Sequence, residues 1–171
     1  MDRLEPDLAG HGRLLESGYH AAMQVRELSA PECTEILERS RLGRLGCSRF
    51  DQPYVVPVHF SFDPERTCLY VVSLIGQKID WMRENPKVCV EIDDIADEKH
   101  WTTVLVFGRY DEIGQTAEHA RVRERAERLL EQRLQWWLPA AAQVPSRQHD
   151  QLVLFRVHID RLSGRRTARK P

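Results

Sequence analysis

The chain has no long apolar run. None of its 171 residues lies in a stretch that approaches the roughly 18 apolar residues of a membrane-spanning helix, and residues 1–22 do not form a charged-then-apolar leader. Lys and Arg total 25 and Asp and Glu total 26, so the net charge of -1 gives no overall attraction to nucleic acid or to an anionic membrane. We therefore expect a soluble, cytoplasmic protein with neither of these partners.

Cysteine is also sparse. The four cysteines form no Cys-x-x-Cys pair and have apolar neighbours, which favours reduced, buried thiols and predicts neither a disulfide framework nor a metal site. The sequence has no Gly-x-Ser-x-Gly elbow and no His-Glu-x-x-His motif, so nothing in it indicates a hydrolase. The cysteines are Cys33, Cys47, Cys68 and Cys89.

Much of the chain is instead β-type sequence. Residues 42–48 and 54–62 are rich in strand formers and flank a turn at 51–53, which predicts a hairpin. The polar residues 93–100 are interpreted as a loop. Gly108 inside a strand is typical of a bulge or of a close backbone approach. The other predicted strands are residues 68–73, 88–92, 101–113 and 152–162.

Three segments predict helices. The first begins at a capping box of Ser29 and Glu32, the second follows Gly76, and the third, before the last strand, repeats apolar residues every three or four positions. About six strands in antiparallel hairpins with three helices favour a small barrel with flanking helices. We predict one domain at residues 23–168, preceded by an N-terminal extension at 1–22.

The segment around Lys78 combines a glycine turn with a helix start. Gly76 allows a tight turn, the first N–H groups of a helix lack intrahelical partners, and Lys78 is placed to meet an anion. Lysine is rare in this chain, with four against 21 arginines. The pattern is typical of a phosphate site, and an ordinary strand-to-helix connection with an exposed lysine is the alternative.

Four motifs follow one another in a recognisable order. They are Pro-Tyr-Val-Val-Pro-Val-His-Phe (53–60), Leu-Tyr-Val-Val-Ser-Leu-Ile-Gly-Gln-Lys (69–78), Asn85-Pro86 before a valine strand, and Trp-Thr-Thr-Val-Leu-Val-Phe-Gly-Arg-Tyr (101–110). The series resembles the FMN-binding split-barrel proteins, and more closely the pyridoxamine 5'-phosphate oxidase-related group that includes the 5-nitroimidazole-resistance proteins. The resemblance covers about residues 23–166 and implies a mainly β, α+β fold, a six-stranded antiparallel split β-barrel with flanking helices.

The resemblance also implies a homodimer that binds FMN in the clefts between its subunits. Lys78, together with Gln77, corresponds to the residue that pairs with the FMN phosphate. The other cofactor positions are the strand behind the flavin ring (Pro57, Val58, His59, Phe60), the edge of the phosphate pocket (Val72, Ser73), and a segment that reaches the flavin from the other subunit (Trp101, Thr102, Thr103).

The resemblance does not extend to every position. Basic residues flank the flavin in the second strand of pyridoxamine phosphate oxidases, whereas Pro57 and His59 stand here, and the C-terminal Arg and His pattern is not recognisable. We therefore predict an FMN-dependent oxidoreductase that acts on a small molecule with NAD(P)H as a reductant, rather than a vitamin B6 oxidase. The alternative is a flavin-binding or haem-binding carrier or sensor without turnover. His59 is the candidate catalytic residue, with a core histidine satisfied by the backbone as the alternative.

Overall fold

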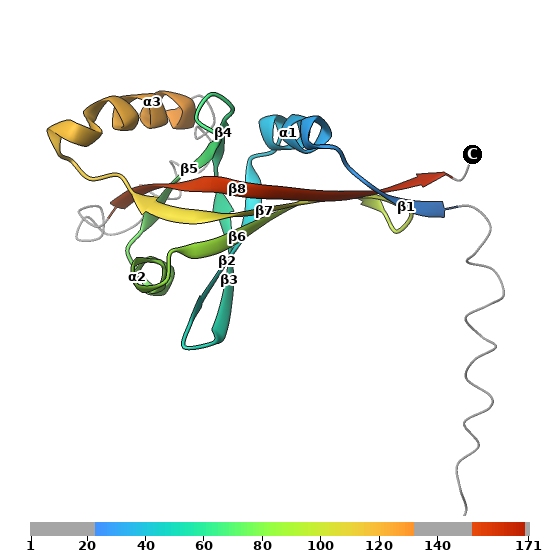
Figure 1. Ribbon diagram of the computed structural model, residues 1–171, viewed down its shortest axis with the longest axis horizontal. Coiled ribbons are helices and arrows are strands. Elements are labelled where there is room, and N and C mark those ends of the chain that lie inside the picture. The colour runs from blue at the N-terminus through green and yellow to red at the C-terminus, as the bar shows by residue number, and fades with distance from the viewer. Residues whose placement is uncertain (1–22, 132–151, 170–171) are drawn as a thin grey trace, which may run out of the picture.

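The computed structural model describes residues 23–131 and 152–169 and shows a twisted sheet whose longest strands have α1 and α3 on one side and α2 on the other (Figure 1). The predicted extension at 1–22 lies outside the described residues. The strands are β1 (Met23–Glu27), β2 (Leu42–Arg49), β3 (Gln52–His59), β4 (Ser61–Asp63), β5 (Cys68–Leu74), β6 (Lys87–Asp97), β7 (His100–Glu112) and β8 (Leu152–Arg169). The helices are α1 (Ala30–Arg39), α2 (Gln77–Glu84), the short 3-10 helix η2 (Ala117–His119) and α3 (Ala120–Glu131).

Every strand pairing in the described part of the chain is antiparallel. The strand order is β3-β2-β6-β7-β8-β5-β4, and β1 pairs with the far end of β8. Strand β3 contacts β5 although the two are not neighbours in this order, so the sheet bends toward a barrel that stays open. The predicted mainly β, α+β split-barrel fold is confirmed.

The interpretation of residues 93–100 as a loop is correct only for the turn at residues 98 and 99, and it is wrong for the rest. Strand β6 continues to Asp97 and remains paired with β7 along this stretch. The acidic side chains of this stretch are compatible with a strand because basic side chains offset their charge. Asp93, for example, accepts a hydrogen bond from Arg44 at 2.5 Å. A polar sequence is therefore compatible with a strand here, since pairing with β7 satisfies the backbone.

The single strand predicted at 54–62 is divided in two. The strand is interrupted at Phe60, whose backbone N–H donates to the carbonyl of Arg41 at 3.0 Å. The next three residues form β4, which pairs with β5. Together with β1, which has few apolar residues to reveal it, this break gives the described part of the sheet eight strands where the sequence predicts about six.

Gly108 has both of the roles that the sequence indicates. The register between β7 and β8 shifts between Phe107 and Gly108. A Cβ atom at Gly108 would lie 2.1 Å from the carbonyl oxygen of His158. Only glycine therefore allows the two backbones to approach this closely.

The helices add apolar side chains to two hydrophobic clusters. The capping box is confirmed, because the Glu32 carboxylate accepts the Ser29 N–H at 2.9 Å. Helices α1 and α2 pack against the barrel interior, whereas α3 covers β5 through Ala126 and Leu130. The larger cluster includes Cys33, Ile36, Leu37, Leu45, Val58, Phe60, Leu69, Val71, Ile79, Met82, Val90, Ile92, Val104, Val106, Phe155 and Val157.

A two-residue turn joins β2 to β3. Its residues, Phe50 and Asp51, have φ values of 48° and 61°, so both are left-handed. This conformation suits the hairpin twist and costs roughly 1–2 kcal/mol for a residue with a bulky side chain. Phe50 is 87% exposed, so packing does not explain its presence.

No helix within 23–131 or 152–169 is both long and apolar enough to span a membrane. No group of three or more His, Cys, Asp or Glu side chains in those ranges is arranged to hold a metal ion.

Candidate functional site

The start of α2 is an uncapped helix terminus. Gly76 is the N-cap residue, it has no side chain to cap the helix, and its carbonyl accepts the N–H groups of Ile79 and Asp80. The N–H groups of Gln77 and Lys78 precede these bonds and are the donors that a helix offers to an anion. The tight glycine turn predicted here is wrong, because φ of Gly76 is 166°, an extended value, and a Cβ atom would meet nothing within 4 Å.

Lys78 is a half-buried cation at this terminus. Among the residues that the structure describes, no carboxylate pairs with it and no hydrogen bond holds it. Burial lowers the pKa of Lys78 below 10.5, and the nearby Cys47 acts in the opposite direction. A partly desolvated ammonium without a counter-ion is a favourable place for an external anion, whose charge would offset the cost of burial.

Val72 and Ser73 precede this terminus at the end of β5. Both side chains are half-buried, and Val72 packs against the cluster beneath α3. The Ser73 hydroxyl donates to the carbonyl of Leu74 at 3.1 Å. Strand β3 also contacts β5, so two of the three predicted cofactor segments lie on strands that contact each other.

The segment at the end of β3 alternates between core and surface. Val58 and Phe60 are buried in the barrel core, whereas Pro57 is exposed and His59 is half-buried. His59 Nδ1 lies 3.2 Å from the carbonyl oxygen of Arg41. A ligand outside the barrel would therefore contact the side chains of Pro57 and His59 but only the backbone of Val58 and Phe60.

The third segment, at the start of β7, lies apart from the other two. Strands β2 and β6 separate β7 from β3 in the sheet. Thr102 is buried and accepts a hydrogen bond from Arg166 Nε at 3.0 Å, so its side chain is occupied within the fold. Trp101 and Thr103 are half-buried and alternate with Thr102, so they occupy the other face of the strand. Within one chain they do not join the Lys78 region.

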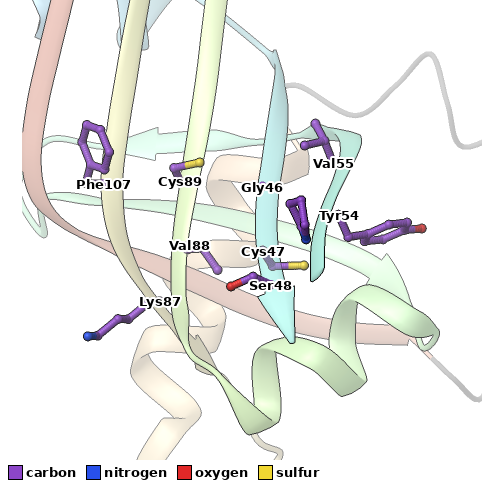
Figure 2. A pocket seen from close by; sticks show the side chains of 10 residues that line it. Gly46, Cys47, Ser48, Tyr54, Val55, Lys87, Val88, Cys89 and Phe107 are labelled. Carbon is purple, nitrogen blue, oxygen red and sulfur yellow. The ribbon is translucent and has the colours of Figure 1, made fainter. Parts of the chain in front are cut away.

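A concave region that the sequence analysis missed lies on the outer face of β2, β3, β6 and β7. Figure 2 shows Cys89 and Phe107 on adjacent strands beside Gly46 and Val55. The cavity has a volume of about 350 Å³. A Cβ atom on Gly46 would lie 2.9 Å from Cys89 Sγ, so glycine leaves the room that the thiol occupies. Its lining residues are Gly46, Cys47, Ser48, Pro53, Tyr54, Val55, Lys87, Val88, Cys89 and Phe107.

This outer face is continuous with the third segment. Thr103 and Phe107 are four residues apart on β7, so alternation puts them on the same face. Val55 is 62% exposed there, and the guanidinium carbon of Arg161 lies 4.0 Å from the centroid of the Phe107 ring. The sequence signal for this surface was a glycine inside a strand, Gly46, with apolar residues such as Val55 on the paired strand.

The family assignment follows from comparison with known proteins. The family model described as pyridoxamine 5'-phosphate oxidase matches residues 29–166, which include the three predicted cofactor segments. The chain belongs to this family. The resemblance inferred from the four motifs is therefore confirmed.

Several known proteins are similar to this chain over most of its length. It is 40% identical over 146 residues to the uncharacterized protein RA0666 of Rhizobium meliloti, covering 84% of this chain and 95% of the relative. It is 38% identical to an FAD-binding protein of Mesorhizobium loti, with a TM-score of 0.69 and coverage of 85% of this chain and 98% of that one. A Bacteroides thetaiotaomicron protein provisionally assigned to 5-nitroimidazole antibiotic resistance shares the fold, with 15% identity, a TM-score of 0.61 and coverage of 86% and 90%.

Proposed function

We propose that this protein binds a flavin and acts as a flavin-dependent oxidoreductase on a small molecule. The observation that carries the proposal is Lys78, a half-buried cation without a carboxylate partner among the described residues, at an uncapped helix start. The Mesorhizobium loti relative, at 38% identity, is named as FAD-binding. FMN is the predicted cofactor, and FAD contains the same mononucleotide unit.

The residues around Lys78 fit the phosphate of that unit. A flavin phosphate needs a basic group and several N–H donors, and Lys78 with the first N–H groups of α2 supplies both. The open space beside Gly76 leaves the terminus accessible. Gln77 is exposed at the same turn and adds an amide donor.

Other residues of the chain orient the cofactor and its substrate. A bound flavin supplies the electron transfer, with NAD(P)H as the reductant. Pro57 and His59 present the outer side of β3, and the backbone of that strand is fixed by its pairing with β2. When His59 carries its proton on Nδ1, it donates to the Arg41 carbonyl, which holds the ring in one orientation. The expected role of His59 is to position the substrate or to transfer a proton to or from it.

We predict that Lys78→Ala weakens FMN binding about ten-fold to a hundred-fold. A hydrogen bond to a charged group contributes about 1.5–3 kcal/mol, and the variant loses that bond while the fold stays intact. Fluorescence titration with FMN measures the dissociation constant. Lys99→Ala, which removes an exposed lysine from the turn between β6 and β7, is the matched control and should bind FMN as the wild type does. Equal affinities for all three proteins would place the phosphate elsewhere.

We predict that FMN affinity falls with alkaline pH because of Lys78. The charged ammonium binds the phosphate, so affinity is kept below the pKa of Lys78 and lost as the pH rises through it. Because burial lowers this pKa, the loss begins at a lower pH than for an exposed lysine. Titrations between pH 7 and about 10.5 test this, and Lys78→Ala should lack the alkaline decline.

The working unit in this proposal is a homodimer, in which Trp101 and Thr103 reach the flavin bound by the partner. The partly apolar outer face that carries Thr103 and Phe107 supports this, since a second copy would cover it. We predict that Thr103→Arg shifts sedimentation from dimer to monomer and lowers flavin content. A wild-type monomer with one flavin per chain would rule out the shared cleft. A fully dimeric, fully loaded variant would place the cleft away from β7.

A further inference from the structure

The turn residue Phe50 is unexplained by the fold. A left-handed, two-residue hairpin turn favours Asn or Gly, yet the chain places a phenylalanine there with φ of 48°. The side chain is 87% exposed, so it stabilises no core. An exposed aromatic ring on a hairpin turn with a left-handed backbone is a feature that points to an external contact.

Arg49 lies between this ring and the end of α2. Its guanidinium carbon lies 4.9 Å from the centroid of the Phe50 ring. Its Nε lies 2.7 Å from Glu84 Oε2 at the end of α2. The two side chains form an ion pair, but the N–H does not point at the oxygen well enough to form a hydrogen bond. Asn85 Nδ2 also donates to the carbonyl of Ser48 at 3.1 Å, which ties the hairpin to the end of the helix.

The path from Lys78 to Phe50 runs along the junction of α2 and the hairpin. Lys78 and Glu84 are six residues apart, so the helix rises about 9 Å between them. Between them the Trp81 ring, half-buried, lies 5.5 Å from the centroid of Tyr54. Phe50 is three residues beyond Cys47, which neighbours Lys78, so the ring lies about 10 Å further along β2. Figure 1 shows this hairpin extending from the sheet beside α2.

We propose that the flavin held at Lys78 is FAD, and that its adenine stacks on Phe50. This inference rests on the proposed function, since it extends the same phosphate site. The adenosine half of an extended dinucleotide spans the distance between a phosphate at Lys78 and the ring at the hairpin tip. The adenine has an aromatic face for Phe50, and Arg49 supplies a cation beside it. FMN has no group that reaches the tip.

The test compares FAD with FMN in variants of Phe50. Phe50→Asn removes the ring and installs a residue that tolerates the left-handed turn, so its melting temperature should equal or exceed that of the wild type. The ratio of FAD affinity to FMN affinity, measured by titration, should fall about 5- to 100-fold. Phe50→Trp keeps an aromatic face and should preserve the wild-type ratio.

Other outcomes separate this inference from the proposed function. An unchanged ratio in Phe50→Asn, with flavin still bound through Lys78, would overturn the adenine site and leave the flavin proposal standing. A shift in sedimentation with an unchanged ratio would show that Phe50 contacts a second copy of the chain instead. A wild type that binds neither FAD nor FMN would overturn both proposals.

Discussion

An Arg125→Met variant should unfold at a clearly lower denaturant concentration than the wild type. Arg125 on α3 reaches Asp63 at the end of β4, with Nε 2.5 Å from Oδ2 and Nη2 2.8 Å from Oδ1. The Asp63 side chain is fully buried. Removing Arg125 takes away the only cation on this buried carboxylate among the described residues and leaves it two backbone N–H donors, which is destabilising. Chemical denaturation measures the difference.

The pH dependence gives this prediction a second readout. Burial alone would raise the pKa of Asp63, but hydrogen bonds from Arg125 and from the N–H groups of Arg66 and Glu65 outweigh burial and lower it. In the wild type this stabilisation is fully present above the pKa that Asp63 has in the unfolded chain. It is lost as the pH falls through the lower pKa that Asp63 has in the folded protein. Without Arg125, protonation relieves the buried charge. The gap between variant and wild type should therefore narrow from pH 7 toward pH 4.

Arg128→Met is the matched control for this experiment. Arg128 is exposed on the same helix, so its replacement should change stability by less than about 0.5 kcal/mol. Similar losses for both variants would indicate a general effect of arginine on α3 and would contradict the role of the Asp63 pair.

A Gly108→Ala variant should lose about 3 kcal/mol or more. The new Cβ would lie 2.1 Å from the His158 carbonyl oxygen and 2.9 Å from Val157 Cγ1, and the first of these is backbone that cannot rotate away. Strands β7 and β8 would have to separate at the bulge, in the middle of the sheet. Thermal and denaturant unfolding measure the loss.

Gly114→Ala provides the comparison for Gly108. A Cβ there would lie 3.3 Å from His119 Nδ1, and that ring belongs to a side chain that can move. Its cost should stay below about 1 kcal/mol. If the two alanine variants were equally stable, the close approach of β7 and β8 would not constrain residue 108.

The sequence predicts the fold well where one residue pattern dominates. The capping box at Ser29 and the bulge at Gly108 each depend on local chemistry, and both are confirmed. Residues 93–97 were mistaken for loop because their strand is stabilised by pairing with β7 and by distant basic partners such as Arg44. Strand β1 is stabilised by pairing with the end of β8, which lies far away in the sequence, so its own sequence gives little signal.

The candidate site was predicted less completely. Lys78 could be found because a helix start and a rare lysine are visible in the sequence. The role predicted for Gly76 was wrong, because its backbone is extended and no neighbouring atom requires a glycine there. Alternation puts Thr102 and Thr103 on opposite faces, but it could not reveal which of the two is buried or that Thr102 accepts a hydrogen bond from Arg166. The outer cavity depends on four strands that come together only in the fold.

The most direct test of the central claim compares FMN with riboflavin, which has the same ring and ribityl chain without the phosphate. The wild type should bind FMN about ten-fold to a hundred-fold more tightly than riboflavin, because only FMN engages Lys78. Lys78→Ala should bind the two with similar affinity. Equal affinities in the wild type, or a preference for FMN that persists in Lys78→Ala, would contradict a flavin phosphate held at the start of α2.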